Sequence, residues 1–279
     1  MGLGTRGVGA LALGLTLLGA GGCATRSADW VFDIRAANAP SRVPPGADDT
    51  VLLNIIASII THDLGLPLPA AVPAVAYGDE ASFTSGLERR GVGSERAQEA
   101  ARLSSAVANG AGIFLRSDVL RGMSTTDRAR LYAHELAHVA QTRLGGGPGA
   151  PMWIREGHAD WVAFRVVEVL GGPSFAKSRE HRRHLLLGST TPRAQLPPLS
   201  ELETTAEWVQ AVKTFGSNAI YGQAFLAVDW LVERYTEEQL RSVMRSFGKG
   251  RQPRPSGAVS PVEYLGFVAE FRAYLETLQ

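Results

Sequence analysis

The sequence predicts an α+β fold with two lobes. Its strand patterns all lie before residue 118, and every regular pattern after residue 124 is helical. The chain has 279 residues, of which 45% are hydrophobic, and this suffices for one good-sized core. We therefore expect one domain over residues 51–279, with a mixed α/β lobe at 51–145 and a helical lobe at 146–279.

The first 22 residues have the features of a secretory signal peptide. Arg6 precedes an uncharged run from Val8 to Ala20 that ends in small residues. This run is well short of the roughly 20 apolar residues with which a helix crosses a bilayer. The sequence predicts export, with residues 23–50, rich in small residues and proline, as a tether. The alternative is a cytosolic protein that begins with a hydrophobic helix.

Cys23 is the only cysteine in the chain and directly follows Gly21 and Gly22. This arrangement resembles the lipobox of bacterial lipoproteins, with Ala20 where leucine is usual. The resemblance implies cleavage before Cys23, acylation of Cys23 and attachment to a membrane outside the cytoplasm. Cleavage by the ordinary signal peptidase is the alternative, and it would give a soluble secreted or periplasmic protein.

The charge of the chain gives no reason to expect a nucleic-acid partner. The formal net charge is +1, and loss of residues 1–22 removes one basic residue, Arg6, and no acidic one. The most basic segment is KSREHRRH at 177–184, which we interpret as a solvated helix face in preference to a contact for lipid headgroups or substrate.

The elements of the expected α/β lobe can be placed in order. Apolar residues recur at helical spacing over 51–64 and stop before Gly65. After this helix we expect a strand with turn residues behind it at 71–83, a helix at 94–109 and a short apolar strand at 111–117. Residues 174–215 show no clear pattern, and later helices are expected at 221–235, 237–247 and 261–278.

Two further helices carry the candidate functional residues. Ser124 and Asp127 form a capping box ahead of a helix that Gly145 ends. A second helix is expected from about Trp153 to Leu170.

A metal site is predicted on these two helices. His134 and His138 are four residues apart, so both imidazoles face one side of the helix and can bind one ion. Glu135 lies on the neighbouring strip, where its carboxylate can take a proton from a metal-bound water. A catalytic zinc ion usually has three protein ligands, and the next helix offers Glu156 as the third.

Two neighbours of Glu156 are judged from helical geometry. Asp160 lies one turn after Glu156 on the same face, so we expect it to accept a hydrogen bond from a ligand histidine. The alternative is an aspartate in solvent. His158 is about 200° round the helix from Glu156 and is expected to point away from the ion.

The motif HELAH at 134–138, followed by WxxEGxA at 153–159, resembles the gluzincin zinc metallopeptidases, above all the peptidase MA-like family. The resemblance implies a zincin-like fold with the active site between the two lobes, one Zn²⁺ per chain, and hydrolysis of peptide or protein substrates. It also implies that Glu135 acts as general base and general acid. The implied zinc ligands are His134, His138 and Glu156.

The same resemblance suggests two further roles. The segment GIFL at 112–115 corresponds to an edge strand that pairs with extended substrate, with an interior strand as the alternative. Tyr221 resembles a tyrosine that stabilises the oxyanion, with plain packing as the alternative. The segment 109–115 lacks the acidic residue with which aminopeptidases hold a free amine, so endopeptidase action is favoured. The rival function is a non-catalytic, lipid-anchored binding or scaffold protein that retains a zincin fold.

Overall fold

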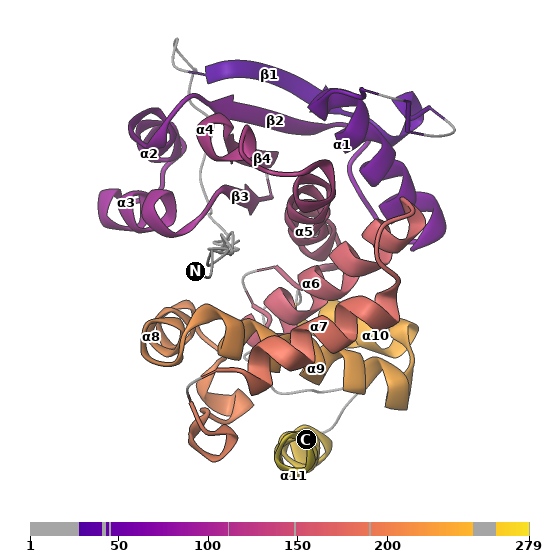
Figure 1. The fold of residues 1–279 in the computed structure, drawn as a ribbon, viewed down its shortest axis with the longest axis vertical. Coiled ribbons are helices and arrows are strands. Elements are labelled where there is room, and N and C mark those ends of the chain that lie inside the picture. Colours follow the sequence, from indigo (N-terminus) through magenta and orange to yellow (C-terminus); the bar gives the residue numbers. More distant parts are fainter. Residues whose placement is uncertain are drawn as a thin grey trace, which may run out of the picture.

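The computed structural model describes residues 28–40, 43–44, 46–110, 112–147, 149–189, 191–247 and 261–278. The expected signal peptide at 1–22 and Cys23 lie outside the described residues. The described chain has a mixed α+β fold, with a small sheet in the upper part of Figure 1 and a larger group of helices in the lower part.

The sheet has four strands in the order β1-β2-β4-β3. These are β1 (Ala28–Ile34), β2 (Val72–Tyr77), β3 (Ala106–Asn109) and β4 (Gly112–Arg116). Strand β2 pairs antiparallel with β1 and parallel with β4, while β3 pairs antiparallel with β4. Strands β2 and β4 are therefore interior, and β1 and β3 are the two edges.

The helices fall into two groups along the chain. The first comprises α1 (Asp49–Ser58), which continues as the π-helix η2 (Ile59–Asp63), α2 (Glu80–Arg89), α3 (Ser94–Leu103), α4 (Ser117–Leu120) and α5 (Thr125–Leu144). The second comprises α6 (Met152–Val169), α7 (Phe175–Leu187), α8 (Thr205–Phe215), α9 (Ser217–Tyr235), α10 (Glu237–Phe247) and α11 (Pro261–Thr277). Short 3₁₀ turns are η1 (Ala36–Asn38), η3 (Arg193–Gln195) and η4 (Leu199–Glu201).

The structure corrects the prediction that residues 23–50 form a tether. Residues 28–34 are strand β1, which pairs with β2 at one edge of the sheet. Every second side chain of the strand packs toward the core, which is the period of a half-buried strand. These side chains are Trp30, Phe32 and Ile34.

The structure also corrects the prediction of one helix over residues 94–109. Helix α3 ends at Leu103, Ser104 is extended, and residues 106–109 form the edge strand β3. Serine side chains compete with helical backbone hydrogen bonds, and Val107 favours a strand, so the helix stops here. The segment GIFL lies in the interior strand β4, so its assignment to the edge was wrong and the interior alternative holds.

The two motif-bearing helices agree closely with their predicted bounds. The Ser124 side chain accepts a hydrogen bond from the N–H of Asp127, and Gly145 ends α5 in the left-handed conformation with φ of 92°. Helices α5 and α6 pack on each other, and α6 also packs on α9. A Cβ atom at Gly157 would lie 2.3 Å from the carbonyl oxygen of Ala224, so α9 passes directly against α6 beside Glu156.

The unassigned segment 174–215 contains helices α7 and α8. Two arginines of the basic segment 177–184 do not simply face solvent, as expected, because they join helices. Arg179 pairs with Asp229 on α9, and Arg182 pairs with Asp160 on α6. Among the described residues, no helix is both long enough and apolar enough to cross a membrane.

Candidate metal centre

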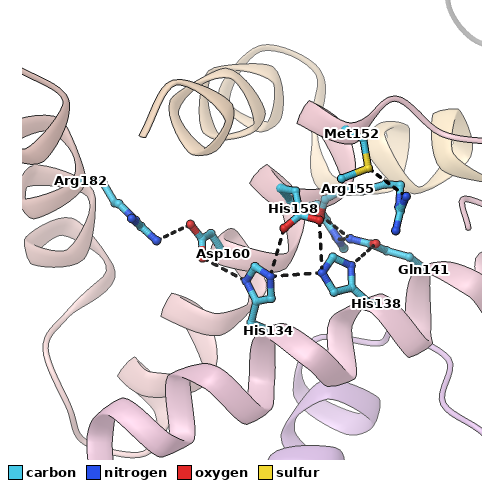
Figure 2. A network of polar contacts seen from close by, with 9 residues as sticks. His134, His138, Gln141, Met152, Arg155, His158, Asp160 and Arg182 are labelled. Carbon is cyan, nitrogen blue, oxygen red and sulfur yellow. Dashed lines mark hydrogen bonds and ion pairs between the residues drawn. The ribbon is translucent and has the colours of Figure 1, made fainter. Parts of the chain in front are cut away.

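The three predicted ligand residues come together where α5 meets α6 (Figure 2). His134 Nε2 lies 3.2 Å from His138 Nε2 and 3.4 Å from Glu156 Oε2, and His138 Nε2 lies 3.6 Å from Glu156 Oε1. Ligand atoms at 2.0–2.1 Å from a tetrahedral ion would be about 3.3–3.4 Å apart. The three groups therefore have the spacing of ligands around one ion.

Hydrogen bonds on the far side of each ring determine which nitrogens are free. His134 Nδ1 lies 3.1 Å from Asp160 Oδ1, and His138 Nδ1 lies 2.9 Å from Gln141 Oε1. Both oxygens accept, so each Nδ1 donates and each neutral ring presents a lone pair at Nε2. The buried oxygens of Glu156 also lack a hydrogen-bond donor. Acceptors that converge without a donor between them are unfavourable when buried, and a cation satisfies them.

The charges of the site agree with this. Burial opposes a charge on His134, but the hydrogen bonds and charges of Asp160 and Glu156 outweigh it and raise the pKa of His134 to about 10. Burial and the charge of His134 lower the pKa of His138 well below its usual value. A divalent ion would therefore displace a proton from His134, as ligand binding by imidazole requires.

Asp160 lies where the sequence predicted, against a ligand histidine. It is 4% exposed, so the alternative of an aspartate in solvent is wrong. One carboxylate oxygen accepts from His134 and the other accepts from Arg182 on α7 (Figure 2). Burial would raise the pKa of Asp160, but Arg182 and His134 outweigh it and hold the pKa below its usual value. Asp160 thus stays ionised and orients the His134 ring.

Glu135 is buried beside the ligand group and is not part of it. Its exposed fraction is 0%, and neither carboxylate oxygen accepts a hydrogen bond of ordinary geometry. Burial raises the pKa of Glu135 to about 8, and the charge of Glu156 adds to the rise. The charge of His134 and the nearby backbone N–H of Ala108 oppose it.

The free edge of strand β3 is directed toward this carboxylate. The N–H of Arg116 donates to the carbonyl of Ser105 at 3.0 Å, so these two residues are a hydrogen-bonded pair of the β3–β4 ladder. Because such pairs alternate in an antiparallel ladder, Ala106 and Ala108 direct their backbone groups away from β4. This places the N–H of Ala108 on the side of Glu135.

Tyr221 lies in the second turn of α9 and is 5% exposed. Its ring packs edge-on against Trp208, with 5.0 Å between ring centroids. Burial raises the pKa of Tyr221 well above its usual value, and the charges of Glu156, Asp160 and Glu135 raise it further. The phenol is therefore close to the carboxylates of the metal centre.

Sequence reasoning missed two residues of the site and judged one correctly. Gln141 contacts His138, and its spacing of three residues on one helix face could have indicated it. Arg182 contacts Asp160 from a helix whose pattern was not clear. His158 is outside the ligand group, as predicted, and its Nδ1 lies 3.1 Å from Gln141 Nε2.

Comparison with known proteins gives one family match. Residues 76–146, about a quarter of the chain, match the eCIS core domain, a family associated with extracellular contractile injection systems. The matched segment runs from the end of β2 to just beyond α5, so it includes His134, Glu135 and His138 and ends before Glu156. No curated protein and no solved structure matches the chain.

Proposed function

We propose that this protein is a zinc-dependent peptidase of the gluzincin type, which hydrolyses peptide bonds outside the cytoplasm and favours internal bonds. In this proposal the sheet-bearing part and the helical part are the two lobes of a zincin-like arrangement, with the metal centre between them. The zinc ligands are His134, His138 and Glu156.

The buried carboxylate of Glu135 is the observation that carries this proposal. An ion that only stabilises a fold needs its ligands and no additional buried acid. A carboxylate without partners is costly to bury, so its presence beside three ligand groups favours a chemical role. Acceptance of a proton from water is the role that suits a carboxylate in this position.

The donor set favours zinc over other common ions. Two imidazole nitrogens and one carboxylate oxygen suit zinc, and three protein ligands leave one of its four positions open. Magnesium and calcium prefer sites made of oxygen atoms.

The residues around the ligands have complementary roles in this mechanism. A bound zinc ion supplies the Lewis acidity that activates water and polarises the scissile carbonyl group. Glu135 takes the proton of the attacking water and passes it to the leaving amine. The phenol of Tyr221 donates a hydrogen bond to the oxygen on which negative charge develops. Asp160 holds the ring of His134 in its orientation.

The edge strand β3 offers a place for the substrate. The backbone groups of Ala106 and Ala108 point away from β4 and can pair with an extended peptide beside Glu135. Pairing through the main chain makes few demands on side chains, so this contact binds peptides of varied sequence.

Cleavage of a mixed peptide library by the purified, zinc-loaded protein tests the proposal. The parent should cleave peptides, and phenanthroline should stop cleavage because it removes the ion. Glu135→Gln should keep one zinc ion per chain and lose about 100- to 10,000-fold in activity, the range for loss of a general base. His138→Ala should fail to hold zinc. A Glu135→Gln variant as active as the parent would contradict the proposed mechanism.

The family match favours a second candidate function. The chain would then be a non-catalytic, lipid-anchored binding or scaffold protein associated with a contractile injection assembly, with the metal centre serving the fold. Zinc should still raise the melting temperature of such a protein, while the zinc-loaded parent would leave the whole peptide library uncut. The same library experiment therefore separates the two candidates.

A further inference from the structure

Gln141 connects the two helices of the metal centre. It is 1% exposed and lies on α5, three residues after the ligand His138. Its Oε1 is 2.9 Å from His138 Nδ1, and its Nε2 is 2.8 Å from the carbonyl oxygen of Arg155 and 3.1 Å from His158 Nδ1 (Figure 2). Arg155 and His158 stand on either side of Glu156 in α6.

The carbonyl group of Arg155 determines how the amide of Gln141 is oriented. A carbonyl oxygen only accepts hydrogen bonds, so the amide nitrogen must face it. The reversed amide would place two acceptors 2.8 Å apart. Oε1 therefore faces His138 and can only accept, which requires His138 Nδ1 to donate.

The second hydrogen of the amide nitrogen points to His158. His158 Nδ1 must accept it, so a neutral His158 carries its own hydrogen on Nε2. His138 and His158 are thus held in opposite tautomers by the same side chain. The free lone pair of His138 is on Nε2, toward the ligand group, whereas the lone pair of His158 is occupied by Gln141.

We propose that Gln141 is a positioning residue that selects which buried histidine binds the metal. It holds His138 as an Nε2 ligand and keeps the lone pair of His158 away from the ion. The proposal rests on the metal centre and does not depend on peptide hydrolysis.

The ligand histidines consequently have unlike supports. His134 donates to the carboxylate of Asp160, which Arg182 holds, whereas His138 donates to a neutral amide. A carboxylate acceptor increases the basicity of its histidine more than an amide does, so His138 depends on correct orientation more than on added charge.

The zinc affinity of the full protein, measured by competition with a chromophoric chelator, tests this role. Gln141→Leu removes the acceptor at similar volume and should weaken zinc binding about 10- to 100-fold. Gln141→Glu keeps an acceptor for His138 and should retain most of the affinity. Gln223→Leu is the matched control, because Gln223 is also 1% exposed and donates to a carbonyl, that of Pro197 at 2.8 Å, without contact to a ligand histidine. Its zinc affinity should equal that of the parent.

Proton–nitrogen correlation spectra of the zinc-loaded parent test the tautomers directly and need no variant to fold. The hydrogen should be found on Nδ1 of His138 and on Nε2 of His158. The proposal is overturned if His138 carries its hydrogen on Nε2, if Gln141→Leu binds zinc like the parent, or if Gln141→Glu loses as much affinity as Gln141→Leu. None of these measurements involves cleavage, so this proposal and the peptidase proposal can fail independently.

Discussion

Tyr221 is the residue at which substrate turnover can be separated from metal binding. Its phenol is buried near the carboxylates of the centre and is not one of the three ligands. Tyr221→Phe should lower kcat about 100-fold, the lower end for loss of one oxyanion donor. Zinc content and KM should stay close to the parent values, because the ligands and the peptide edge are intact. Unchanged kcat would mean that the ring only packs against Trp208.

Asp229 allows a prediction about stability that is independent of the metal centre. It is 5% exposed on α9, and burial raises its pKa to about 6, although the charge of Arg179, 2.7 Å away, opposes the rise. A carboxyl with a raised pKa favours its neutral form in the folded state. Its contribution to stability is therefore complete below the unfolded pKa and is lost as pH rises to about 6.

Asp229→Asn should remove this dependence on pH. Relative to the parent, the free energy of unfolding of the variant should rise by up to about 3 kcal/mol between about pH 4 and 6. Urea denaturation of both proteins across this range measures the difference. A difference that stays constant with pH would show that Asp229 titrates alike in the folded and unfolded chains.

At the level of elements, the contact between α6 and α9 sets the position of Glu156. Gly157 allows the close approach, since an added Cβ would meet the backbone of Ala224 and the side chain of Val228. Gly157→Ala should destabilise the protein by about 1–3 kcal/mol despite the better helix propensity of alanine, because the backbone of α9 must move.

Gly266→Ala is the matched control for this prediction. Gly266 lies inside α11, and a Cβ there meets nothing within 4 Å, so alanine should stabilise the protein by roughly 0.5–1 kcal/mol. Opposite signs of the two effects in thermal denaturation are expected. Weaker zinc binding should accompany only the Gly157 substitution.

The sequence predicted long helices well and short strands poorly. Helices α5 and α6 carry a capping serine, terminal glycines and many residues of regular pattern, all of which are local signals. Strand β3 has four residues and follows α3 directly, so its pairing with β4 decides its conformation. Strand β1 alternates over too few residues to be noticed among the small residues around it.

The same division applies to the site. The spacing of His134, His138 and Glu156 could be derived from two helices alone. Asp160 followed from helical periodicity as well. Gln141 and Arg182 act across helix contacts, which depend on the packing of α5, α6 and α7 and have no local signature. The identity of the edge strand likewise depends on the order of strands in the whole sheet.

For the molecule as a whole, the proposed lipid anchor at Cys23 can be tested during export. Globomycin should block processing of the precursor in a bacterial host, because it inhibits the peptidase that cleaves before lipid-modified cysteines. Mass spectrometry of the membrane fraction should find a diacylated N-terminus at Cys23, and Cys23→Ala should lose this modification. An unmodified N-terminus beyond Cys23 would contradict the anchor and favour a soluble secreted protein.

Strand β1 determines how far such an anchor lets the protein reach. The strand begins at Ala28, so only residues 24–27 separate it from Cys23. At about 3.3–3.6 Å per residue, the chain from Cys23 to Ala28 extends at most roughly 17 Å. A lipid on Cys23 would therefore keep the edge of the sheet close to the bilayer surface. A peptidase held at that height would act on polypeptides that lie on the membrane or emerge from it, and polypeptides farther away would have to come to it.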